Sequence, residues 1–197
     1  MGIRQFFALC LSMLLAASAQ ATFQRKDEEL ADAKRLVTDL YTQVVARHPL
    51  GLPWGEDKEV FSPYLSKALH GRLKLALDCG KDWHRQFPSR DLKPQYAWLE
   101  LGIFSGYSEM TAPSEFAIDS VTPMRKKDVS RVVLRLQTGE PGYPVETWLV
   151  AVTVVLENGR SLVDDVIYQP DIYGNDERLS GALSAGCRGG RWVGRSR

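Results

Sequence analysis

The sequence predicts an α+β domain, with two N-terminal helices packed on a curved antiparallel sheet of about four strands and a short C-terminal helix. Apolar residues recur at helical spacing over residues 27–48 and 63–79, and from residue 116 onward they alternate with polar residues as in strands. The dipeptide Asn158-Gly159 lies between two β-rich runs and is a strong hairpin signal, because both residues tolerate positive φ. With 197 residues, 44% of them hydrophobic, the chain suits one domain with a packed core.

The first predicted helix spans residues 27–48, carries acids in its first turn and ends at Pro49. The second predicted helix begins with Ser62 as N-cap and Pro63 at the first helical position, and it ends near Cys79-Gly80 or one turn later. Between residues 87 and 114 we expect an ordered irregular segment, since it holds many aromatic residues among its prolines and glycines. Four strands follow, over 116–121, 129–138, 145–157 and 160–169, and then a closing helix over about 176–185.

The charges of the chain nearly cancel, with 25 Lys and Arg against 24 Asp and Glu. A protein that tracks nucleic-acid phosphates needs a surplus of bases, so we expect no nucleic-acid partner. The counts of 16 Gly, 10 Pro and 3 Cys exclude collagen-like and disulfide-dense scaffolds.

Residues 1–21 have the pattern of a signal peptide. Arg4 precedes an apolar run over residues 6–17, and Ala19-Gln20-Ala21 has the small-x-small pattern that signal peptidase accepts. The run is shorter than the about 20 residues that span a bilayer, so a retained anchor is the weaker alternative. We therefore expect cleavage after Ala21, a single domain over residues 22–187 and a flexible basic tail over 188–197. The predicted location is a periplasm or the outside of the cell, with no stable membrane anchor.

Two cysteines remain after the predicted cleavage, Cys79 and Cys187. An oxidising compartment and an even count favour a disulfide between them. The alternative is a zinc-binding or nucleophilic role, but their spacing matches no common metal motif and no metal site is predicted. In the chain-entropy model, closing so long a loop stabilises the fold by about 4 to 5 kcal/mol at most.

The predicted hairpin determines which side chains share a face of the sheet. A two-residue turn pairs Glu157 with Arg160, and counting back places Asp165 on the apolar, concave face with Trp148 and Val152. A carboxylate there is either held by hydrogen bonds or prepared as a general base, and the first alternative is favoured. On the same count Asp164 lies on the outer face, within reach of Arg131 or Arg135.

Four segments resemble a known family: FSPYLSKAL at 61–69, LGIFSG at 101–106, ENGRSLVDDVIY at 157–168 and Leu179-Ser180. They are similar to an exported bacterial domain of unknown function in the nuclear-transport-factor-two-like superfamily of cone-shaped, cystatin-like α+β folds. The resemblance covers residues 27–187 and implies a curved sheet wrapped by helices around a pocket. Because that superfamily includes dehydratases, isomerases, binding domains and immunity proteins, the fold does not choose among them.

Three functions follow as hypotheses. The first is a non-catalytic protein of the cell envelope that binds a small apolar ligand or a protein partner at the cone mouth, with Trp98, Tyr107, Trp148 and Asp165 as binding residues. The second is a hydrolase, isomerase or dehydratase with Asp165 as base. The third is an immunity or inhibitor protein against an exported toxin. No nucleophile, zinc or dinucleotide motif is present in the sequence, so no cofactor is predicted and an enzyme is the less favoured class.

Overall fold

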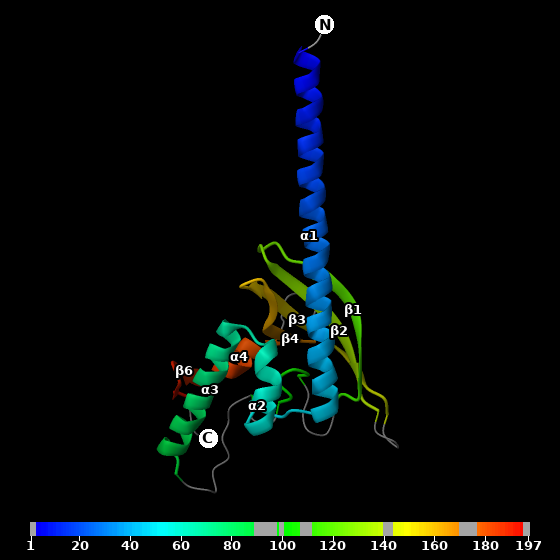
Figure 1. Cartoon of the computed structure of the whole chain (residues 1–197). Helices are drawn as coiled ribbons and strands as arrows, with labels where there is room; N and C mark the ends of the chain where they lie inside the picture. The colour runs from blue at the N-terminus through cyan, green and yellow to red at the C-terminus, as the bar shows by residue number, and fades with distance from the viewer. Residues whose placement is uncertain are drawn as a thin grey trace.

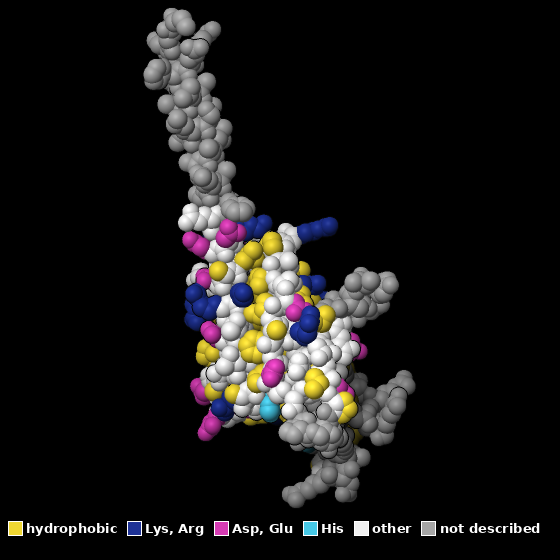
Figure 2. Space-filling model, turned by 90° about the vertical axis from the view of Figure 1, so that its right-hand side faces the viewer, with side chains coloured by type: hydrophobic (Ala, Val, Ile, Leu, Met, Phe, Trp, Pro, Cys, Tyr) yellow, Lys and Arg dark blue, Asp and Glu magenta, His cyan; other side chains and the backbone are white. Residues whose placement is uncertain are grey.

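The computed structural model describes residues 3–88, 98, 101–106, 112–139, 144–169 and 177–194, with side chains from residue 24 onward. Helices pack against an antiparallel sheet, so the predicted α+β class is confirmed (Figure 1). Helix α1 (Ile3–Arg47) crosses one face of the sheet, while α3 (Lys67–Gln86) and α4 (Leu179–Ser184) lie beside the sheet at β4 (Arg160–Tyr168). On the face seen in Figure 2, acidic and basic side chains are interspersed around hydrophobic ones, as a nearly neutral chain requires.

The sheet contains five antiparallel strands in sequence order. They are β1 (Glu115–Pro123), β2 (Val129–Gln137), β3 (Thr147–Glu157), β4 and the two-residue β5 (Glu177–Arg178). The first four lie close to their predicted bounds, whereas β5 was not predicted. The turn between β3 and β4 has φ of 52° at Asn158 and 76° at Gly159, which confirms the hairpin.

Helix α1 begins earlier than predicted and runs without a break into the segment that we interpret as a signal peptide. Its core-facing stripe agrees with the prediction, since Ala33, Val37, Leu40, Tyr41 and Val44 are all buried. The helix ends where expected: His48 adopts a positive φ of 47° and its amide donates to the carbonyl of Val44, just before Pro49. In the part of the chain with described side chains, no helix has both the length and the apolar character of a membrane span.

The predicted second helix is three elements rather than one. Helix α2 (Gly55–Phe61) leads into a 3-10 turn, η1 (Ser62–Tyr64), and α3 begins only at Lys67. Ser66, not Ser62, is the N-cap of α3, and its hydroxyl accepts a hydrogen bond from the Leu69 amide at 3.0 Å. The break has a tertiary cause, because Leu65 bridges to Val163 of β4 and the Ser66 amide donates to the Val163 carbonyl at 2.8 Å. Helix α3 also continues to Gln86, well past the predicted end.

A disulfide joins α3 to the C-terminal segment. Cys79 and Cys187 are bonded with their Cα atoms 5.9 Å apart and 108 residues between them in sequence, as predicted. Cys187 begins β6 (Cys187–Arg188), which pairs with β7 (Arg191–Trp192).

The described part of the expected flexible tail is a small hairpin packed on α3. The Trp192 side chain is buried, and its amide donates to Asp82 Oδ2 at 3.0 Å. The hydrogen bonds from the Trp192 amide and from Gln86 lower the pKa of Asp82. The ordered domain therefore extends beyond the boundary that we predicted at residue 187.

We expect the disulfide to be a main source of stability. Replacing both cysteines (Cys79→Ser with Cys187→Ser) should lower the free energy of unfolding by about 2–4 kcal/mol, because the unfolded chain regains the freedom of a long loop. Urea unfolding followed by circular dichroism measures the change. The wild-type protein with a reductant should match the double variant, and an unchanged midpoint under reduction would contradict the prediction.

Candidate functional site

The face of the sheet that α1 covers is filled by the irregular segment 101–106. Three consecutive carbonyl oxygens of this segment each accept a hydrogen bond from a buried side chain. The Tyr168 hydroxyl donates to Ile103 at 2.8 Å, the Tyr41 hydroxyl to Phe104 at 2.6 Å and the Trp148 indole to Ser105 at 2.9 Å. These donors come from β4, α1 and β3, so the segment ties three elements together. Burial raises the pKa of Tyr41 and of Tyr168 far above the ordinary value, and both phenols remain protonated donors.

This filling decides where the predicted binding residues lie. Trp98 and Trp148 are only 4% and 6% exposed and belong to the main hydrophobic core. Tyr107 lies outside the described residues. A ligand-binding role for Trp98, Tyr107 and Trp148 stays a prediction, while the contacts of Trp148 give it a structural role.

Gly106 lets the filling segment approach β4 closely. Its φ is +76°, and a Cβ atom built there would lie 2.7 Å from Cδ1 of Tyr168. Both the backbone conformation and the space therefore require glycine.

The predicted register between β3 and β4 holds only near the turn. Glu157 faces Arg160 and Val154 faces Val163 as predicted, but a bulge then inserts one residue into β4. Beyond it Thr153 faces Asp165, where Asp164 was predicted, and Val152 faces Val166, where Asp165 was predicted. The placement of Asp165 on the Val152 face was therefore wrong, because a bulge moves every later residue to the other face.

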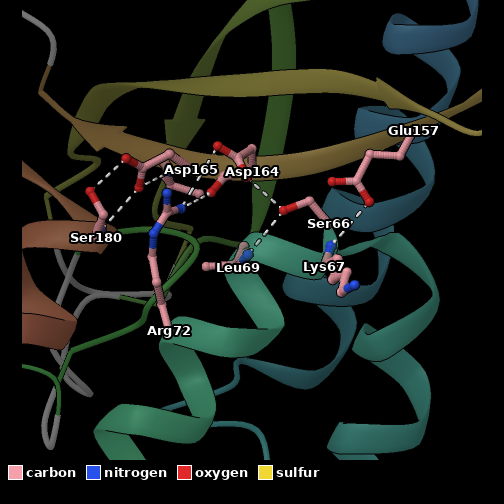
Figure 3. A network of polar contacts seen from close by, with 9 residues as sticks. Ser66, Lys67, Leu69, Arg72, Glu157, Asp164, Asp165 and Ser180 are labelled. Carbon is pink, nitrogen blue, oxygen red and sulfur yellow. Dashed lines mark hydrogen bonds and ion pairs between the residues drawn. The ribbon is translucent and has the colours of Figure 1, made fainter. Parts of the chain in front are cut away.

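The Asp165 carboxylate holds the start of α4 (Figure 3). Its Oδ1 accepts hydrogen bonds from the amides of Val166 and Ser180, each at 3.0 Å, and its Oδ2 accepts one from the Ser180 hydroxyl at 2.7 Å. The residue is 7% exposed. Since both oxygens are engaged by the protein itself, this geometry supports a structural role for Asp165.

The bulge turns Asp164 toward α3. Its Oδ1 accepts a hydrogen bond from the Ser66 hydroxyl at 2.6 Å, and its carbonyl accepts one from Arg72 at 2.8 Å. The predicted partners of Asp164 were wrong, since Arg135 pairs instead with Asp119 of β1 at 2.9 Å. The two neighbouring aspartates of β4 thus each position the beginning of one helix.

A groove of about 510 Å³ lies between the segment after α1 and the surface of α3. Its walls carry the apolar side chains Leu52, Pro53, Trp54, Leu65, Leu73 and Leu77, with Ser62 and the bases Lys58, His70 and Lys74. Leu52 and Leu65 are buried, whereas Trp54 is 54% exposed. In its described lining the groove has no carboxylate, and an apolar surface of this kind commonly marks a binding site.

Sequence reasoning missed this groove because it assigned Leu73 and Leu77 to the buried stripe of the second helix. The structure leaves both residues partly exposed. The one local signal was Trp54 in the short loop after the first helix, where a large aromatic residue has no local reason to occur. Among the described residues, no three His, Cys, Asp or Glu side chains are grouped so that they could hold a metal ion.

No protein-family model, curated protein or solved structure matches the chain. The residues of the site are therefore interpreted from their own chemistry.

Gly106→Ala should be more destabilising than Gly159→Ala. Both glycines have a φ of +76°, so the backbone penalty of about 1–2 kcal/mol is shared. A Cβ at residue 159 meets nothing within 4 Å, whereas one at residue 106 meets the Tyr168 ring. We expect an additional loss of about 1–3 kcal/mol for Gly106→Ala, measured by urea unfolding. Equal midpoints for the two variants would show that the segment is not packed as described.

Asp165→Ala should lower the free energy of unfolding by about 2–3 kcal/mol, because it leaves the buried amides of Val166 and Ser180 without an acceptor. Asp119→Ala is the matched control, since it removes a carboxylate from a partly exposed ion pair and should cost less than about 1 kcal/mol. Thermal and urea unfolding measure both. A stable Asp165→Ala variant would return this carboxylate to the list of candidate catalytic groups.

Proposed function

We propose that the protein is an exported, non-catalytic binding domain of the cell envelope. Its ligand is an amphipathic small molecule with an anionic end, held in the groove between residues 52–54 and α3. The observation that carries this proposal is an exposed apolar groove whose described charged side chains are all basic.

The apolar part of the groove supports the first half of the proposal. Six apolar side chains surround a volume within the range of small-molecule sites. Trp54 stays half exposed to water without a ligand, and covering it would remove apolar surface from solvent.

The charges around the groove support an anionic end on the ligand. Lys58 and His70 are exposed at the groove, and Lys74 is near Asp78 at 3.0 Å on the helix surface. The nearest acids of α2, Glu56 and Asp57, pair with Arg47 at 3.5 Å and 2.6 Å. A carboxylate or phosphate at the groove mouth would thus meet bases whose charge the neighbouring acids do not cancel.

Export is supported by the signal-peptide pattern of residues 1–21 and by the disulfide, which persists in oxidising compartments. The α+β arrangement agrees with the resemblance to the nuclear-transport-factor-two-like superfamily, and membership stays part of the proposal. The enzymatic alternative draws less support, because Asp165 is engaged by the start of α4.

The experiment uses Leu73→Gln and Leu75→Gln, which make the same change on the same helix. Leu73 lines the groove, whereas Leu75 is 48% exposed outside it. With dodecanoate as the probe, we expect Leu73→Gln to weaken binding about tenfold or more, because burying a leucine side chain contributes about 1.5–3 kcal/mol. Leu75→Gln should bind as the wild type does. Calorimetric titration gives both affinities.

Two results would contradict the proposal. One is the absence of dodecanoate binding to the wild type. The other is a protein partner, rather than a small molecule, on the chain when it is recovered from the envelope and measured by native mass spectrometry. In a further arm, Lys58→Gln with Lys74→Gln should weaken binding of dodecanoate and leave binding of dodecanol unchanged.

A further inference from the structure

A second cleft lies at the opposite end of the domain from the groove. It has a volume of about 390 Å³ and opens between the first described turns of α1 and the turn that joins β1 to β2. Its lining consists of Arg25, Lys26, Glu29, Leu30, Pro123, Met124, Lys126, Lys127, Asp128, Val129 and Ser130.

The charge of this cleft is positive. Four bases line it against two acids, and Glu29 is already paired with Arg25 at 3.0 Å. Within the described residues, no carboxylate lies at ion-pair distance from Lys26, Lys126 or Lys127. Arg125 adds an exposed base beside them, although Asp27 and Glu28 follow Lys26 on α1. Segments 100 residues apart in sequence thus bring bases together in a chain whose total charge is near zero.

The floor of the cleft is apolar. Leu30, Pro123, Met124 and Val129 line it, and Met124 is 41% exposed. A cleft with a basic rim and an apolar floor suits a ligand with an anionic head and a hydrocarbon portion.

The position of the cleft says which such ligand it meets. Dark-blue basic side chains lie at the end of the domain from which α1 projects in Figures 1 and 2. Along the continuous helix α1, the apolar run 6–17 ends eight residues before Arg25, a rise of about 12 Å. When that run enters a bilayer, the cleft comes within about a Debye length of the headgroups.

We propose that this cleft binds the surface of a bilayer that contains anionic phospholipid. The bases contact headgroup phosphates, and Met124 with its apolar neighbours enters the headgroup region. A nucleic acid is disfavoured as the ligand, since a compact cleft with a small surplus of bases offers no extended track for phosphates. The contact holds the domain near the membrane with the end that carries α1 toward the lipid, and leaves the groove at α3 facing away.

The test measures sedimentation with vesicles. The full sequence is expressed, and the exported protein is recovered with the N-terminus that mass spectrometry assigns. It is mixed with vesicles of phosphatidylcholine alone or with 30% phosphatidylglycerol. We expect stronger binding to the anionic vesicles and loss of that difference at high salt. Each base near an anionic surface contributes about fivefold to affinity, so Lys126→Glu with Lys127→Glu should weaken anionic binding at least about 25-fold.

The control is Lys34→Glu with Lys81→Glu, which changes the net charge equally at exposed lysines outside the cleft. It should bind the anionic vesicles within about threefold of the wild type, because surface potential decays within a Debye length. Equal binding to both vesicle types, or equal loss in both double variants, would overturn the proposal. So would full competition by millimolar inorganic phosphate, which would assign the cleft to a free anion. None of these readouts involves dodecanoate or the groove.

Discussion

The three carbonyls of Ile103, Phe104 and Ser105 explain why this sheet and its helix can enclose an irregular segment. Backbone without regular structure carries polar groups that cannot be buried unpaired, and here one phenol or indole from each of α1, β3 and β4 pairs them. Because the donors belong to separate elements, the same three hydrogen bonds also set how far apart those elements stand. Burial that raises the pKa of Tyr41 and of Tyr168 keeps both phenols protonated in this role.

Strand β4 organises the other side of the domain. Its bulge places two adjacent carboxylates at its edge and outer face, where Asp164 meets the N-cap of α3 and Asp165 meets the start of α4. The disulfide then connects α3 to the chain just after α4. Helix starts, strand edge and covalent link form one continuous support. The surface of α3 on the opposite side of this support is therefore fixed in place, as a preformed groove requires.

Local patterns predicted what local forces decide. The stripe of α1, the four strands, the turn at Asn158-Gly159 and the disulfide follow from periodicity, turn chemistry and redox compartment. The bulge in β4 does not, because one inserted residue is selected by helices that pack against the strand, and it reversed the face of Asp165. The same holds for α3, where pairing of Leu65 with Val163 moved the N-cap from Ser62 to Ser66. The groove depends on Leu73 and Leu77 remaining uncovered, and periodicity alone cannot tell an apolar stripe that meets the core from one that meets solvent.

The link between Cys79 and Cys187 also constrains the order of events when the chain is made. The earlier cysteine leaves the ribosome or a translocation pore long before the later one, and all of β1–β4 emerges in between. Helix α3 thus waits for most of the sheet before it can be locked, and its caps on β4 wait as well. The domain gains its final form late and as a unit, so a chain passing through a narrow channel would meet no prematurely closed loop on the way.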